Sequence, residues 1–381
     1  MVESQRDPHR LRCGSSQIPY SITGWNSDIF PNSRLLLTGT HKMHDRIHRH
    51  SRKFRACKLI LFLCAGLISG NAWTENADRL LRKAGRYFSA LPAQMPGAEN
   101  DTPQLIALGS KLYADPRLSK NDTQSCASCH PLDNMRAGMD NLPRSPGAEG
   151  ALGSRNTPTV LNAGWQFALF WDGRAKDLAD QAGQPIVNPI EMGMPDQQSV
   201  IDKLAGLEEY RSAFREAYPD SEDPITYAHL TRAIAAFERT LRSESRFDDF
   251  LRGDPEALNA QEQNGLNLFI RTNCVRCHDG PMVGGTLYEK LGVYTPFHNI
   301  EDQGRFEVTK KEADRMVFKV ASLRNVALTS PWFHDGSAAS LADVVRLMGR
   351  MQLEVELKAG EIADIVAFLG SLSDKALEKK P

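Results

Sequence analysis

Two short cysteine motifs constrain this chain more than any other feature: CASCH at residues 126–130 and CVRCH at residues 274–278. Both read C-x-x-C-H, the signature at which c-type haem is attached. Two thiols one helical turn apart can each form a thioether to a haem vinyl group, and the adjacent histidine then lies under the iron as its axial ligand. We therefore expect two covalent haems, held by Cys126, Cys129 and His130 and by Cys274, Cys277 and His278.

Other uses of paired cysteines fit this spacing poorly. A four-cysteine zinc site usually separates its pairs by about 15 to 20 residues, whereas here the gap runs from Cys129 to Cys274. Zinc also gives no role to the histidine after each pair. Redox dithiols of the thioredoxin kind need one pair in a strand–helix setting. Haem remains the favoured interpretation.

The N-terminal segment has the pattern of an export signal. Six basic residues, Arg46, Arg49, Arg52, Lys53, Arg55 and Lys58, precede the apolar run LILFLCAGLISG and a small-residue site that ends at Ala72. This run is too short to cross a bilayer alone, for which about 20 residues are needed. We expect residues 1–72 to be an N-terminal extension and signal peptide cleaved near Ala72, with Met43 a more natural start than Met1. An uncleaved anchor is the alternative.

The three remaining cysteines, Cys13, Cys57 and Cys64, all precede that cleavage site. A mature chain would therefore contain no cysteine outside the two C-x-x-C-H motifs. Export also predicts a periplasmic location, where c-type haem proteins work. No stable membrane span is expected in the mature protein.

Hydrophobic spacing indicates the fold class. The formal net charge is -1, which argues against nucleic acid as a partner. Apolar residues recur three and four positions apart, as in amphipathic helices, over residues 199–218, 225–241, 257–272 and 361–372. Strand alternation is scarce, so we expect a mainly α protein.

The chain also repeats itself. WDGRAKDLAD at 171–180 matches HDGSAASLAD at 334–343, and an Arg-Asn pair precedes each, at 155–156 and at 324–325. A chance likeness between Asp-Gly turns is the alternative, but the shared order of three motifs favours two related units. We therefore expect two cytochrome c-like haem domains related by an internal repeat, over residues 73–245 and 246–381.

The second repeat copy contains a methionine suited to the sixth position of iron. A thioether often fills that position in c-type haem proteins and raises the potential. Met348 lies seven residues after Leu341 on the helical run SLADVVRLMGR. Met351, one turn further, is the alternative ligand.

The first copy has no such residue at the same place. Seven residues after Leu178 lies Pro185, whose side chain cannot bind iron. The first iron is therefore expected to be five-coordinate or water-bound, unless Met135 or Met139 covers it. An iron with an open face can bind a small molecule, so this haem is the predicted reaction site.

Polar residues near this open face suggest peroxide chemistry. Gln181 lies one turn before Pro185, and Glu191 follows in NPIEMG. A carboxylate in an apolar haem pocket can accept a proton from bound peroxide and return it to the leaving oxygen. An amide can hold the peroxide in place. A solvated surface carboxylate is the alternative for Glu191.

At this point the chain resembles the bacterial dihaem cytochrome c peroxidases and their relatives of the MauG type, which oxidise tryptophans in a partner protein. The resemblance runs from about Ala77 to Ser373 through the motifs CASCH, SRNTPTVLN, FWDGRAKDLADQA, NPIEMG, CVRCHDGP, LRNVALTSPWFHDG and LMGRMQL. It implies that Gln181, Pro185 and Glu191 line the peroxide pocket, and that Met348 closes the electron-accepting haem.

The same resemblance implies further roles. Trp171 would lie between the haems as an electron conduit, with a buried aromatic of no redox role as the alternative. A calcium ion would bind the side chain of Asn156 and the backbone carbonyls of Thr329 and Pro331, oxygen donors suited to a hard cation. His334 is the counterpart of Trp171 in the repeat, and we expect it to be structural.

One departure from the family pattern concerns activation. Many of these peroxidases cap the peroxidatic iron with a histidine from the loop before S-R-N, where this chain has Ala148 or a close neighbour. The resemblance therefore implies an enzyme that is active when fully oxidised. The MauG type is also uncapped but has a tyrosine where this chain has Met348.

The sequence thus predicts a periplasmic dihaem peroxidase that reduces hydrogen peroxide to water. A peroxidatic haem lies in the first domain and an electron-transfer haem in the second, which receives electrons from a small cytochrome c or cupredoxin. A homodimer is expected from the family. The alternatives are a MauG-like oxidase of tryptophan side chains and a non-catalytic dihaem electron carrier.

Overall fold

The computed structural model describes residues 76–133 and 136–377. These residues belong to one compact unit that spans Ala65–Pro381. The predicted signal peptide, its cleavage near Ala72, and the cysteines at 13, 57 and 64 lie outside the described residues. Among the described residues no helix has both the length and the apolar content to span a membrane.

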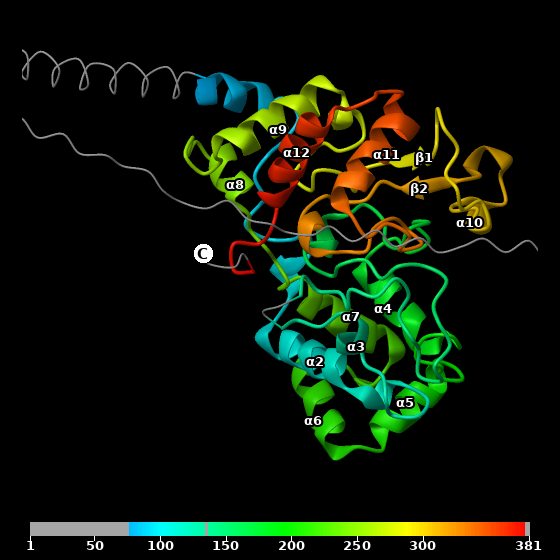
Figure 1. Ribbon diagram of the computed structural model, residues 1–381. Helices are drawn as coiled ribbons and strands as arrows, with labels where there is room; N and C mark the ends of the chain where they lie inside the picture. Colours follow the sequence, from blue (N-terminus) through cyan, green and yellow to red (C-terminus); the bar gives the residue numbers. More distant parts are fainter. Residues whose placement is uncertain (1–75, 134–135, 378–381) are drawn as a thin grey trace, which may run out of the picture. The chain divides into compact units, whose positions relative to one another are not determined.

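Helices dominate the described chain, which confirms the predicted mainly α class (Figure 1). They are α2 (Pro103–Ala114), α3 (Cys126–Cys129), α4 (Leu178–Val187), α5 (Gln197–Ala205), α6 (Glu208–Ala217), α7 (Tyr227–Glu238), α8 (Arg246–Leu251), α9 (Ala260–Arg271), α10 (Phe306–Thr309), α11 (Leu341–Leu353) and α12 (Ala359–Gly370). Two short strands, β1 (Tyr288–Lys290) and β2 (Val317–Lys319), pair antiparallel with Tyr288 opposite Lys319. Residues 76–84 are also helical.

The periodic stretch at 199–218 forms two helices rather than one. Helix α5 ends at Ala205 and α6 begins at Glu208. Gly206 lies between them, where its amide still bonds to the carbonyl of Asp202. Glycine lowers helix stability because its backbone is so free, and the chain turns here. The other three stretches each match one helix, α7, α9 and α12.

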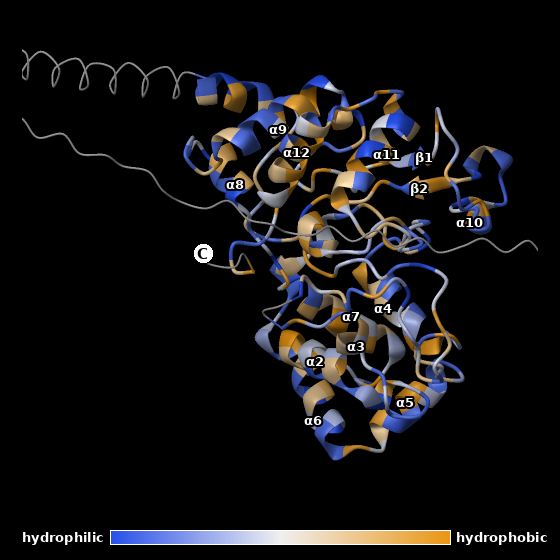
Figure 2. Cartoon of the chain, in the orientation of Figure 1, coloured by the Kyte–Doolittle hydropathy of each residue, from blue (hydrophilic) through white to orange (hydrophobic). Residues whose placement is uncertain are grey.

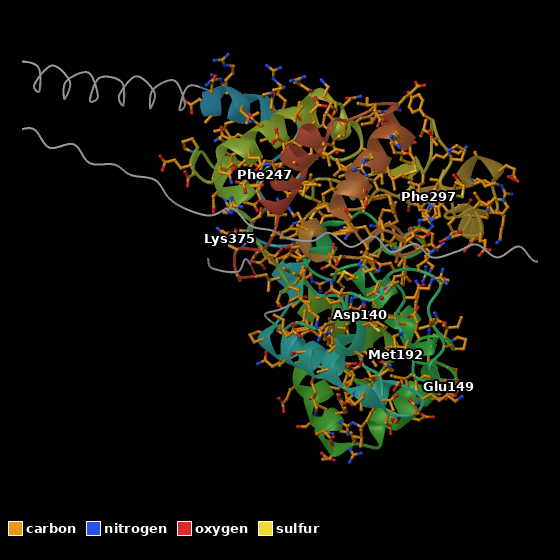
Figure 3. All side chains as sticks on the ribbon, viewed as in Figure 1. Asp140, Glu149, Met192, Phe247, Phe297 and Lys375 are labelled. Carbon is orange, nitrogen blue, oxygen red and sulfur yellow. The ribbon has the colours of Figure 1, made fainter. Side chains whose placement is uncertain are left out.

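The helices bury two main hydrophobic cores. The first core unites side chains of α2 and α4–α7, including Leu112, Tyr210 and Phe214. The second unites α8, α9, α11 and α12, with Phe247 and Phe368 at its centre. Figure 2 shows hydrophobic stretches inside each group of helices, on α7 in one and around α12 in the other, and Figure 3 labels Phe247 among α8, α9 and α12.

The start of the described chain packs in the second core, not the first. Ala84 and Phe88 are buried against it, and the carbonyl of Tyr87 accepts a 2.8 Å hydrogen bond from the amide of Gly280. The amide of Leu91 donates to Asp248 at 2.9 Å. Residues 76–91 therefore pack on the core formed by α8, α9, α11 and α12.

Each core contains one very close helix crossing at a glycine. A β-carbon added to Gly109 of α2 would lie 1.9 Å from the carbonyl oxygen of Ala233 in α7. One added to Gly265 of α9 would lie 1.9 Å from the carbonyl oxygen of Asp364 in α12. Only glycine allows these backbones to approach so closely. Both cores thus use the same device to pack an early helix on a late one.

The two halves also share an unusual backbone conformation after each haem motif. Asn162 and Asn325 both have positive φ, as do Phe170 and Phe333, and Gly173 and Gly336. Bridges join Leu169 to Ala175 and Trp332 to Ala338. In this register Trp171 corresponds to His334, Leu178 to Leu341 and Pro185 to Met348.

This register revises one equivalence drawn from sequence. The Arg-Asn pair at 324–325 corresponds to Leu161 and Asn162, not to the pair at 155–156. The side-chain amides of Asn162 and Asn325 both donate to the hydroxyl of Ser243, at 2.8 and 2.9 Å. Two asparagines with this matched role are harder to see than an Arg-Asn dipeptide, because their likeness lies in φ and in a shared partner.

The glycine crossing yields a stability prediction. Gly265→Ala forces the backbones of α9 and α12 apart and should lower the free energy of unfolding by about 1–3 kcal/mol. The matched control is Gly360→Ala on the partner helix α12, where an added β-carbon meets nothing within 4 Å. Thermal unfolding of both variants with haems attached tests this. Equal melting temperatures for the two variants would contradict the close crossing.

Candidate active site

A continuous cavity of about 870 Å³ contains both cysteine motifs. None of these four cysteines is paired in a disulfide. Its wall includes the residues predicted for both haems, namely Cys126, Cys129, His130, Cys274, Cys277, His278 and Met348, together with Gln181, Pro185, Glu191 and Trp171. Much of the rest of the wall is aliphatic or aromatic, such as Ile234, Phe269 and Leu369. A cavity with this lining suits large apolar discs held by thioethers.

The first motif forms the single turn α3. The amide of His130 bonds to the carbonyl of Cys126 at 2.9 Å, which sets the two thiols and the imidazole on one turn. The hydroxyl of Tyr113 donates to the carbonyl of His130 at 2.6 Å. Imidazole Nδ1 lies 3.1 Å from the carbonyl oxygen of Gly138. A proton on Nδ1 leaves Nε2 unprotonated, which is the form that binds a metal.

The second motif forms a 3₁₀ turn over Cys274–Arg276 that closes with the corresponding hydrogen bond. The amide of His278 bonds to the carbonyl of Cys274 at 3.0 Å. Burial lowers the pKa of His278 to about 4 and also lowers that of His130. Burial thus favours the neutral imidazole in both motifs, which is the form that binds a metal.

The two cysteine pairs do not form a zinc site. In the described ranges no three side chains of His, Cys, Asp or Glu come together in a way that could hold a metal ion. A four-cysteine zinc centre would need all four thiols within one tetrahedron. The residues fit two separate haem attachments instead.

The two methionines proposed as ligands lie in different surroundings. Met348, on α11, faces the cavity. Met351 is 3% exposed and packs with Phe297 and Phe333 in a small cluster that Met348 also contacts, but Met351 itself does not line the cavity. Figure 3 labels Phe297 in this part of the molecule. Of the two, Met348 is the one that borders the cavity.

On the first side, α4 and the turn after it position the predicted peroxide residues. Asp177 caps α4 by accepting a hydrogen bond from the amide of Asp180. The turn then folds back on the helix end, since the amide of Met192 bonds to the carbonyl of Pro185 at 3.2 Å. This fold-back sets Glu191 beside Pro185 in the cavity wall, with Gln181 one turn earlier.

Asn188 orients the carboxylate of Glu191. Its amide nitrogen donates to Glu191 Oε1 at 2.9 Å, and its Oδ1 accepts from the amide of Ile190 at 3.0 Å. Burial raises the pKa of Glu191 above its ordinary value, while the charge of Arg174 and the bond from Asn188 oppose that shift. A carboxyl with a raised pKa and a fixed orientation is suited to accept and return a proton.

The loop that could carry a capping histidine is attached to the Glu191 turn. The amide of Ala148 donates to the carbonyl of Glu191 at 2.7 Å. A β-carbon on Gly147 would lie 1.8 Å from the carbonyl oxygen of Ile190, so the two backbones are in close contact. This loop contributes Ser145, Pro146, Gly147, Gly153 and Ser154 to the cavity wall, and none of these has an imidazole or thioether. Figure 3 labels Glu149 of this loop near Met192.

The alternative methionine caps have different standing. Met135 lies outside the described residues. Met139 is 1% exposed and borders the cavity. It directly follows Gly138, whose carbonyl contacts His130 Nδ1, so Met139 lies beside the proximal imidazole.

An aromatic cluster joins the two halves of the cavity. The indole of Trp171 donates to the carbonyl of Asn156 at 2.8 Å, and its ring lies 6.4 Å from that of His334. His334, 2% exposed, stacks on Phe318 at 4.3 Å. The predicted conduit and its repeat counterpart are therefore neighbours at the junction.

Ion pairs hold this junction. Arg155 contacts Asp172 of the first half at 2.5 Å and Asp302 of the second at 2.6 Å. Its pKa is raised by these carboxylates against the effect of burial. Asp302 lies between β1 and β2, so its meeting with Arg155 has no signal in the local sequence.

The predicted calcium ligands share the same region. Asn156, Thr329 and Pro331 all border the cavity. Asn156 Nδ2 donates to the carbonyl of Leu142 at 2.9 Å, which turns its Oδ1 the other way. Nearby, Asn141 Nδ2 donates to the carbonyls of Leu328 and Ser330 at 3.0 and 2.8 Å.

Comparison with known proteins agrees with this site. Residues 103–256 match the family described as di-haem cytochrome c peroxidase. A cytochrome c551 peroxidase of Nitrosomonas europaea is 47% identical over 272 residues, which cover 71% of this chain and 80% of that protein. A methylamine utilization protein MauG of Methylorubrum extorquens is 36% identical over 81% of this chain and 89% of that protein.

Solved structures agree as well. A MauG-like protein associated with microbial copper homeostasis superimposes with a TM-score of 0.67 at 30% identity, covering 76% of this chain and 95% of that protein. The chain is thus similar both to peroxidases and to MauG proteins. It belongs to the dihaem cytochrome c peroxidase family, and it is a dihaem peroxidase.

Proposed function

We propose that this enzyme reduces hydrogen peroxide to water at the His130 haem, with electrons that enter through the haem held by His278 and Met348. The balanced step consumes one peroxide, two protons and two electrons and releases two water molecules. The observation that carries the proposal is the asymmetry of the cavity wall, which presents Met348 on α11 and Pro185 at the matching place on α4. When bound, the haems supply one-electron redox couples and an iron site for peroxide.

The chain's own groups handle the protons. Glu191 would accept a proton from the peroxide oxygen that lies nearer the first iron and return it to the other oxygen, which leaves as water when the O–O bond breaks. Asn188 holds this carboxylate through its 2.9 Å hydrogen bond. Gln181 orients the peroxide, and Pro185 keeps the iron face free of a protein ligand. Trp171 carries electrons across the junction, where it contacts His334.

The same enzyme is active without prior reduction. Ala148 and its neighbours supply no imidazole, and the loop is fastened to the Glu191 turn by the Ala148 amide. The donor is a small cytochrome c or cupredoxin in the periplasm, and the enzyme is a homodimer. The shared positive-φ positions support the two units proposed from the repeat, residues 73–245 and 246–381. Residues 76–91 pack on the core of the second unit.

One calcium ion is also proposed, held by Asn156 and by the carbonyls of Thr329 and Pro331. Its position at the junction would fix the lobes beside the Arg155 ion pairs. Support comes from the oxygen-only donor set, which suits calcium.

The second candidate function is a MauG-like oxidation of a protein tryptophan. The likeness to MauG proteins favours it, since both share the uncapped face. Met348 argues for the peroxidase, because a thioether ligand raises the potential of the haem that takes up electrons.

Activation can be tested by mixing the fully ferric protein with hydrogen peroxide. We expect the haem spectrum to change at once, and added reduced cytochrome c to be oxidised in repeated turnovers. Reaction only after one haem has been reduced would show that the first iron is capped. Prompt reaction without turnover of the cytochrome would favour the protein-modifying alternative.

Substitution of the proposed base gives a second test. Glu191→Gln should slow peroxide reduction by about 10²–10⁴-fold, the usual contribution of general acid–base catalysis. The carboxylate is the active form, so the wild-type rate should fall as pH drops through the raised pKa of Glu191. The variant should lose this acid limb. Glu149→Gln, on the exposed neighbouring loop, is the control, and equal rates in both variants would exclude Glu191 as the base.

The axial ligand of the second haem can be tested by a pair of variants. Met348→Leu should lower the midpoint potential of one haem and abolish the sulfur-to-iron charge-transfer band of the ferric protein, because the thioether ligand is lost. Met351→Leu, three residues along the same helix, should change neither. A loss of the band in Met351→Leu alone would reverse the assignment.

A further inference from the structure

The cavity wall contains one cation whose charge the protein does not balance. Its lysines and arginines are Arg155, Arg174, Lys319 and Arg324. Arg155 and Arg174 pair with Asp172, and Arg324 pairs with Asp248 at 2.7 Å. Within residues 76–133 and 136–377, Lys319 has no carboxylate at ion-pair distance, and its ammonium donates to the amide oxygen of Gln166.

Lys319 is also deeply buried. It is the last residue of β2 and is 8% exposed. Its backbone amide donates to the carbonyl of Trp171 at 2.8 Å, so it lies at the junction where the aromatic cluster joins the two halves. Burial lowers the pKa of Lys319 to about 8. A buried ammonium has three donors, of which a single neutral amide satisfies one.

Such an arrangement is costly unless an anion completes it. Burial of an unpaired charge destabilises a protein by several kcal/mol. Each c-type haem brings two propionate carboxylates into this cavity, attached to the same disc as the thioethers. A carboxylate against a lysine ammonium forms a charge-assisted hydrogen bond, which is about twice as strong as a neutral one.

We propose that Lys319, with Gln166 beside it, binds a propionate of a haem at the junction between the two halves. The contact neutralises one haem carboxylate next to Trp171. It makes Lys319 a positioning residue that raises the potential of that haem, since a nearby positive charge favours the reduced iron. This inference rests on the two haems and not on the peroxide chemistry.

The test compares the midpoint potentials of both haems by spectroelectrochemical titration of the dihaem protein. Lys319→Met should lower the potential of one haem and leave the other unchanged. Lys319→Arg, which keeps the charge, should stay close to wild type. Lys290→Met removes an exposed lysine from the facing strand β1 and should change neither potential. The haem that shifts, recognised by the presence or absence of the sulfur-to-iron band, identifies whose propionate is bound.

Two outcomes would overturn the proposal. One is a Lys319→Met protein with both potentials unchanged, and the other is an equal shift in Lys319→Arg and Lys319→Met. If Lys319→Met does not incorporate both haems, Lys319→Gln replaces it, because glutamine still bonds to Gln166 without the charge, and the same shift is expected. Potentials are measured without peroxide, so failure here is distinct from failure of the proposed reaction.

Discussion

The structure depends on enclosing two haems, which are large apolar discs, in a cavity between short helices. Each C-x-x-C-H motif is a single turn whose last amide bonds back to the first cysteine, at 2.9 Å in one half and 3.0 Å in the other. These turns pack on the two cores through Ala127 and Val275, and their thiols and imidazoles face a cavity of about 870 Å³. Haem therefore supplies core that the side chains leave open. The close crossings at Gly109 and Gly265 then bring the flanking helices together beside it.

Function arises from a difference on this shared scaffold. Helices α4 and α11 begin at matching leucines and follow the same positive-φ turn. Pro185 lies inside α4, where it cannot donate the backbone hydrogen bond to Gln181, and the helix ends two residues later, at Val187. The turn from Asn188 to Met194 then folds back on that end and brings Glu191 to the cavity. In the other half α11 continues past Met348 for another turn. Proline in place of methionine thus coincides with a shorter helix and, in the proposed function, with an open iron face beside the base.

Local signals in the sequence predicted the residues of the cavity wall that carry the expected chemistry. The cysteine motifs, Met348, Pro185 and Glu191 are recognisable because each role depends on a residue type at a fixed spacing. The sequence did not indicate roles for Asn188, Gly147 and Lys319, since these roles depend on contacts that form only in the folded chain. The Arg-Asn equivalence failed for a related reason: identical letters at 155–156 and 324–325 outweighed the matched backbone of Asn162 and Asn325. The periodicity of 199–218 likewise could not reveal the break at Gly206.

The charges around the junction form two distinct sets. Arg155 links the halves through Asp172 and Asp302, and Arg324 is held by Asp248, so these cations are balanced by the protein itself. Lys319 differs because its side-chain partner is a neutral amide. Ion pairs within the protein can hold the two halves together before haem is attached. If Lys319 binds a haem propionate as proposed, its charge is balanced only in the holoprotein. Lys319 is also the residue whose backbone amide donates to the carbonyl of Trp171. Cofactor attachment and the electron path between the haems are then coupled at a single side chain.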